Sequence, residues 1–282
     1  MAAIKIGGIA LFGIVALWSG GFGFPEASNN ADGFSITGFV ASVALSILAF
    51  KGFTTITNSG GEITNPHRNV GLTIVISIAI CVVIYLLVAL AVGSNLSIDQ
   101  IIAAKDYSLA EAAAPALGQF GFYFTVVLAA VATVSGVLAS VFAVSRMLTM
   151  LTDMKMIPHR HFGMSGPILT HMLVYTVVLA SLLAVFFDLS RIASLGVFFY
   201  LIMDMLVHWG VFRYLRQEIG ANSAILLSAI AFDAIVLIAF TAMKLGSDPM
   251  IVLYAVVGIT TVFVYERFFL SRWIAPNSEG DH

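Results

Sequence analysis

The sequence has 282 residues, of which 60% are hydrophobic and 10% are charged, and its formal net charge is -2. Soluble domains carry about 25% charged residues, so this chain cannot cover a water-facing surface and is predicted to be an integral membrane protein. The weak negative charge excludes the basic field that nucleic-acid binding requires. The single cysteine, Cys81, excludes a disulfide framework and a thiolate metal cluster.

Eight apolar stretches are long enough to cross a bilayer, which takes about 20 mostly apolar residues. The breaks between them hold the polar residues and most of the prolines. The sequence therefore predicts an all-α integral membrane protein with about eight transmembrane helices, in a single transmembrane domain over residues 1–282. The expected spans are residues 4–24, 36–58, 70–93, 119–153, 167–186, 190–215, 222–243 and 250–272.

Lysine and arginine are shared unevenly between the two sets of loops that join these spans. One set carries eight of the thirteen, and the alternate set carries Lys105, Arg191 and Lys244. Because positively charged loops stay in the cytoplasm, we expect a multi-pass plasma-membrane protein with both termini cytoplasmic. The loop over residues 94–118 is expected to contain a short surface helix that begins with a Ser97 cap.

The second stretch contains a lysine followed by a glycine, Lys51-Gly52, at mid-membrane depth. A lysine at a helix centre costs about 2.5 to 3.5 kcal/mol on insertion. Irregular backbone at this depth persists only where it is buried in protein or lines a wet cavity. We therefore expect a helix broken over residues 49–54, of the kind that forms binding sites in secondary transporters. The alternative is an intact helix with a glycine kink and a lysine that snorkels.

The residues around this break resemble the sixth transmembrane helix of amino acid–polyamine–organocation permeases. The similarity is carried by Phe50, Gly52, Phe53, Glu62, Asn65, Pro66 and Arg68. A second segment, residues 130–158, is similar to the eighth helix of that family at Ser145-Arg146, Asp153 and Ile157-Pro158. The resemblance implies that the chain supplies helices five to twelve of a partial inverted-repeat bundle and that the first four helices of the family fold are missing.

The resemblance implies a secondary active transporter, a permease for amino acids or related amines that works by alternating access with a proton as coupling ion. It also implies that the substrate amine binds at the unwound segment, formed by Leu48, Ala49, Phe50, Lys51, Gly52, Phe53 and Thr54. Lys51 departs from the apolar residue usual in the family. Its ammonium could pair with an acidic substrate group or with a structural carboxylate.

The resemblance assigns the coupling proton to Lys5, because several family members have a lysine in the inner part of the fifth helix. Ser135 and Ser140 of the eighth-helix segment could face it. From the residues alone, Lys5 could equally be a positively charged flank that snorkels. The two serines could equally be residues that pack between helices.

Asp204 and His208 lie within the sixth stretch, four residues apart, and therefore share one helix face. This spacing suggests an intramembrane proton relay. The alternative is that both residues form hydrogen bonds with a neighbouring helix. Asp233, in the seventh stretch, is expected to have a packing or oligomer role.

The sequence contains none of the HExxH, Gly-x-Ser-x-Gly or phosphate-loop motifs that would indicate an enzyme. We expect no cofactor and no metal site. The expected partners are a small-molecule substrate, the lipid bilayer, and either a second copy of the chain or the missing N-terminal helices. The alternative function is a non-transporting membrane scaffold or a truncated permease remnant, which no ligand would stabilise.

Overall fold

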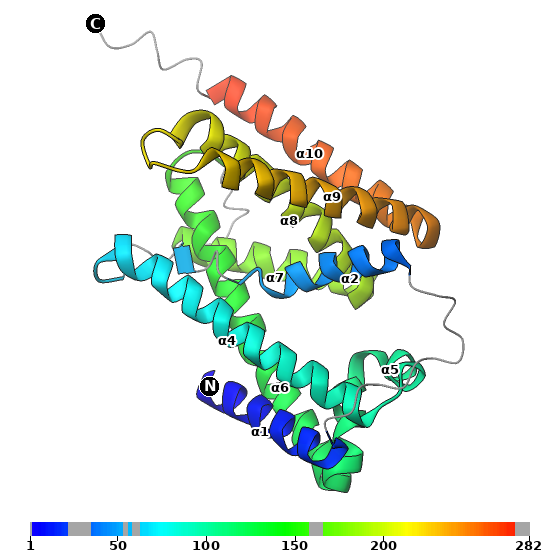
Figure 1. The fold of residues 1–282 in the computed structure, drawn as a ribbon. Coiled ribbons are helices and arrows are strands. Elements are labelled where there is room, and N and C mark those ends of the chain that lie inside the picture. The colour runs from blue at the N-terminus through cyan, green and yellow to red at the C-terminus, as the bar shows by residue number, and fades with distance from the viewer. Residues whose placement is uncertain (1, 22–34, 53–55, 58–62, 158–165, 274–282) are drawn as a thin grey trace, which may run out of the picture. The chain divides into compact units, whose positions relative to one another are not determined.

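The computed structural model describes residues 2–21, 35–52, 56–57, 63–157 and 166–273. All regular structure in these ranges is helical, as Figure 1 shows, and this confirms the predicted all-α fold class. Within these ranges, seven helices are long and apolar enough to cross a membrane. The second expected span, over residues 36–58, does not contain such a helix in the described ranges. Its helix is 14 residues long and ends at Ala49.

The elements follow in chain order. They are α1 (Ala2–Gly20), α2 (Ile36–Ala49), α4 (Pro66–Asn95), α5 (Ile98–Ala104), η2 (Lys105–Tyr107), α6 (Ser108–Asp153), α7 (Ile168–Phe186), α8 (Leu189–Gly210), η3 (Val211–Leu215), α9 (Ser223–Ser247) and α10 (Pro249–Trp273). These elements form two compact units. The first contains α1, α4, α5 and most of α6, and the second contains α2, the end of α6, and α7 to α10.

Small residues on one face of α1 let it pack closely on α4. Gly13, Ala16 and Gly20 repeat at helical spacing, and Ala16 is fully buried. A Cβ atom at Gly13 would lie 2.5 Å from Cγ of Leu87 on α4. The side chain of Asn95 on α4 donates a hydrogen bond to the carbonyl oxygen of Ala16 at 2.9 Å. Close backbone approach and an interhelical hydrogen bond are the usual means of helix association in lipid.

Local signals set the helix ends in the first unit. The predicted Ser97 cap is confirmed: its hydroxyl accepts a hydrogen bond from the backbone of Gln100, whose side chain accepts one from the backbone of Ser97. Pro66 opens α4 at a position where its missing N–H costs no helical hydrogen bond. Helix α6 has a break at Gly118, whose φ is 59°. The part that is long and apolar enough to cross a membrane runs from Leu117 to Asp153, beside the expected span over residues 119–153.

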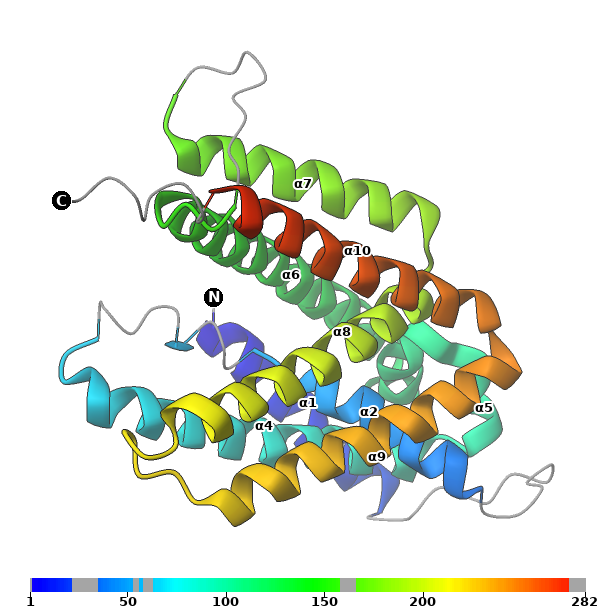
Figure 2. The ribbon, with the colours of Figure 1, turned by 90° about the horizontal axis from the view of Figure 1, so that it is seen from above.

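Side chains from α2, α8, α9 and α10 form the core of the second unit. Phe240 of α9 is fully buried, and its ring centroid lies 5.2 Å from that of Phe198 on α8. Leu201 of α8 and Ile251 of α10 are each 1% exposed in the same cluster. In Figure 2, α9 is connected to α8 at one end and to α10 at the other. Helix α2 packs against both α8 and α9.

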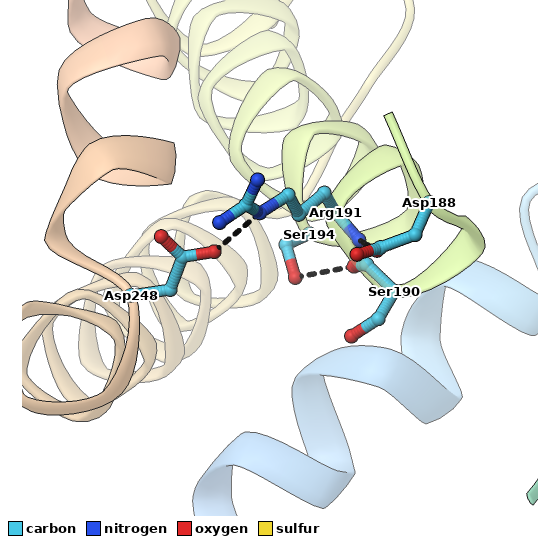
Figure 3. Close-up of polar contacts among 5 residues, drawn as sticks. All are labelled: Asp188, Ser190, Arg191, Ser194 and Asp248. Atoms are coloured by element: carbon cyan, nitrogen blue, oxygen red, sulfur yellow. Dashed lines mark hydrogen bonds and ion pairs between the residues drawn. The ribbon is translucent and has the colours of Figure 1, made fainter. Parts of the chain in front are cut away.

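An ion pair joins the beginning of α8 to the end of α9 (Figure 3). The Nε atom of Arg191 donates to Oδ2 of Asp248 at 2.7 Å. Asp188 caps α8 by accepting a hydrogen bond from the backbone N–H of Arg191 at 2.8 Å, and Ser194 donates to the carbonyl oxygen of Ser190 one turn along. These contacts are partly exposed and contribute little stability, but they fix where α8 begins.

Gly13→Ala is expected to lower the free energy of unfolding by about 1 to 3 kcal/mol, because the added methyl group would overpack the contact with Leu87. Gly7→Ala is the matched control on α1, since in the described ranges no atom outside its chain neighbours and its own helix backbone lies within 4 Å of the position that a Cβ atom would take there. Thermal unfolding in detergent micelles measures both. Equal stability of the two variants would contradict the close packing of α1 on α4.

Candidate functional site

Helix α2 ends inside the bilayer-sized apolar stretch. Its N-terminus is capped by Ser35, whose hydroxyl accepts a hydrogen bond from the N–H of Gly38 at 3.2 Å. At the other end, the N–H groups of Phe50 and Lys51 donate to the carbonyl oxygens three residues earlier, both at 3.1 Å. The helix therefore tightens into a final turn, and Gly52 is the last residue described before a gap. Phe53 and Thr54 of the predicted site lie outside the described residues.

Lys51 pairs with a carboxylate of the protein. Its ammonium nitrogen is bonded to Oδ2 of Asp204 on α8, and the two side chains are 7% and 20% exposed. The same ammonium lies 5.7 Å from the centre of the Tyr200 ring, one turn before Asp204. Of the two pairings that the sequence left open for Lys51, the structure forms the one with a structural carboxylate.

His208 faces α9. Its Nδ1 atom lies 3.5 Å from Oδ2 of Asp233, and both atoms are buried. Asp204 and His208 thus share a face of α8 but have partners on different helices, and no hydrogen bond between them is found among the residues that the structure describes. Sequence reasoning did not find Asp233 as a partner, although its position in the middle of an apolar stretch was a signal.

Lys51, Asp204, His208 and Asp233 form what we call the buried charge cluster. Three helices supply it: α2 through the turn at its end, α8 and α9. With a neutral imidazole, the cluster carries one positive and two negative charges. Such groups within membrane spans are costly and therefore mark candidate functional sites.

The remaining described residues of the predicted substrate site surround the end of α2. Leu48 is half-buried and points toward α8, because a Cβ atom at Gly196 would lie 3.3 Å from its Cδ1. Phe50 is half-buried, whereas Ala49 and Gly52 are exposed. Among the residues that the structure describes, and leaving out its chain neighbours, none has an atom within 4 Å of the position that a Cβ would take at Gly52.

The residues predicted to handle the coupling ion lie in the first unit. Lys5 is half-buried on α1. On α6, Ser135 is half-buried and donates a hydrogen bond to the carbonyl oxygen of Ala132 at 3.1 Å, and Ser140 is exposed. In the part of the chain that the structure covers, no hydrogen bond joins Lys5 to either serine. The same part of the chain contains no cluster of three or more His, Cys, Asp or Glu side chains that could hold a metal ion.

The family model described as amino acid permease matches residues 1–271. Among curated relatives, an uncharacterized protein of Methanocaldococcus jannaschii is 41% identical over 88 residues, which are 31% of this chain and 20% of the relative. The inner membrane transport protein YbaT of Escherichia coli is 25% identical over 202 residues, covering 72% of this chain and 47% of YbaT. A methylthioribose transporter of Bacillus subtilis is 32% identical over 87 residues, covering 31% of this chain and 18% of the transporter. The chain spans about half or less of these relatives.

Lys51→Met is expected to lower the free energy of unfolding by on the order of 3 kcal/mol, because it leaves Asp204 as an unpaired buried charge. Adding Asp204→Asn removes that charge, so the double variant should be more stable than the sum of the single effects predicts. Chemical or thermal unfolding in detergent measures this coupling. Lys244→Met, on the same unit, is the matched control. If the effects of the Lys51 and Asp204 changes on the free energy of unfolding simply add, the result would contradict a stabilising ion pair.

Proposed function

Because this chain belongs to the amino acid permease family, we propose that it acts as a secondary active transporter that moves amino acids or related amines by alternating access. The observation that carries this proposal is the end of α2 at Ala49, followed by the turn that holds Lys51 and Gly52. A helix that stops inside an apolar stretch leaves its terminal backbone groups for a ligand.

The charge of Lys51 bears on the substrate class. An unpaired ammonium beside the site would repel a substrate amine in a medium of low dielectric constant. Asp204 offsets that charge in the structure, so a protonated amine can approach the end of α2 without an opposing field. We infer that the carbonyl oxygens of the segment from Leu48 to Thr54 bind the substrate amine and that Gly52 leaves room for it.

We propose that a proton is the coupling ion and that Lys5 of α1 binds it. Ser135 and Ser140 of α6 are proposed to face Lys5. This assignment is supported by the resemblance to family members that have a lysine in the inner part of the corresponding helix. The orientation that follows from the loop charges places both termini in the cytoplasm of a plasma-membrane protein.

The proposed function is tested with purified protein in proteoliposomes. We expect saturable uptake of one or more radiolabelled amino acids that increases when the outside is made acidic. The substrate panel includes methylthioribose, because one relative is named for it. The absence both of uptake and of any rise in melting temperature with these ligands would favour the scaffold instead.

Gly52→Trp is expected to abolish uptake, because the indole would fill the open space beside the end of α2. Gly246→Trp is the control, since that glycine near the end of α9 also has open space around it. Initial uptake rates at equal protein density give the comparison. Normal uptake by Gly52→Trp would exclude a substrate site at the end of α2.

Lys5→Ala is expected to remove the dependence of uptake on external pH, because the variant lacks the group that binds the coupling proton. Lys244→Ala, which removes a lysine near the end of α9, should leave the pH profile unchanged. Uptake rates are measured over a series of external pH values. A pH profile of Lys5→Ala that matches the unmodified protein would remove Lys5 from proton coupling.

A further inference from the structure

The contact between His208 and Asp233 lies at membrane depth. Asp233 is about 15 Å along α9 from its first residue, at 1.5 Å per residue. The bilayer hydrocarbon is about 30 Å thick, so this carboxylate lies near its middle. His208 approaches it from α8, which packs directly against α9.

The two facing atoms lack a well-formed hydrogen bond. Nδ1 of His208 and Oδ2 of Asp233 are both buried, and neither has a hydrogen-bond partner in the described part of the chain. Their separation of 3.5 Å is beyond the usual length of about 2.9 Å for an N–H···O bond. A proton on Nδ1 would give each atom the partner it lacks once a small movement of the two side chains shortens this separation.

The charges of the cluster also favour one more proton. Lys51 neutralises one carboxylate, so with a neutral His208 the cluster retains one negative charge on Asp233. An uncompensated charge in hydrocarbon is expensive. Protonation of His208 brings the cluster to neutrality and pairs opposite charges across α8 and α9.

Other ionisable groups on η3, α9 and α10 have surroundings of their own. Arg213 of η3 is exposed, and Arg216 donates to the hydroxyl of Ser223 at 2.7 Å. Lys244 lies over the Phe240 ring. Glu266 of α10 lines a groove with Phe199 and Met203, which neither His208 nor Asp233 lines. In the part of the chain that the structure describes, His208 and Lys51 are the charged groups that act on Asp233.

We propose that His208 and Asp233 form a proton-binding site of this protein. A hydronium ion gives its proton to Nδ1 of His208 and leaves as water. The resulting imidazolium donates a hydrogen bond to Oδ2 of Asp233, and the net charge of the cluster changes from negative to zero. When the proton leaves, Lys51 is the cation of the cluster that faces two carboxylates. The occupancy of the site therefore changes the electrostatic attraction between Lys51, at the end of α2, and Asp204 and Asp233. This site goes beyond the proposed function, because it requires no substrate and is separate from Lys5.

The test is the titration of His208 in the whole protein in lipid nanodiscs, followed by the ¹⁵N chemical shifts of the histidine side chains. His208→Gln identifies the resonance. We expect His208 to titrate within the accessible pH range, and Asp233→Asn to move its midpoint down by about 1 pH unit or more, because the counter-charge is lost.

The variants at the other end of the cluster give shifts of opposite sign. Lys51→Met removes a positive charge and should move the midpoint of His208 up, whereas Asp204→Asn removes a negative charge and should move it down. A purely structural role would not produce opposite signs. Where Lys51→Met does not fold, Asp204→Asn and Asp233→Asn carry the test, since both must lower the midpoint.

Asp248→Asn is the control, because this carboxylate pairs with Arg191 at the other end of α9. It should leave the titration of His208 unchanged, and the resonance of the buried His171 should be unaffected by the cluster variants. A His208 that stays neutral throughout, or a midpoint indifferent to Asp233→Asn, would overturn the proposal. Because the measurement uses no substrate, a failure of transport would leave this result standing.

Discussion

The need to neutralise a lysine inside an apolar stretch is the constraint on which the second unit depends. Lys51 can be placed at the end of α2 because Asp204 of α8 lies against it. A lone ammonium at this depth would be excluded or drawn to the surface, and the turn at the end of α2 would move with it. The ion pair therefore holds the end of α2 on α8, where the core around Phe198 and Phe240 completes the packing.

The two units are held together internally by different kinds of contact. In the first, Gly13 and Ala16 allow α1 to approach α4 closely, so that van der Waals contacts act between the two helices. In the second, large aromatic side chains and ionisable groups lie between the helices. Ionisable groups within membrane spans are costly, so the cluster in the second unit is a candidate functional site beside the proposed proton site at Lys5 in the first.

Family membership and residue geometry contribute different parts of the functional argument. The match over residues 1–271 places the chain in the amino acid permease family, and the relatives are named as transporters or are uncharacterized. Neither the family nor the relatives specify what the buried charge cluster does. The proton-binding role is inferred from the buried charge cluster itself. Its negative charges outnumber its positive charges when His208 is neutral, and two of its facing atoms lack hydrogen bonds.

The sequence by itself determined the membrane class, the helical fold and several helix ends, because these depend on neighbours along the chain. The Ser97 cap, for example, follows from local backbone chemistry. The sequence could not decide the partners of Asp204 and His208. Their spacing of four residues puts both on one face of α8, but two helices, α2 and α9, pack beside that face. Only this packing brings Asp204 to Lys51 and His208 to Asp233.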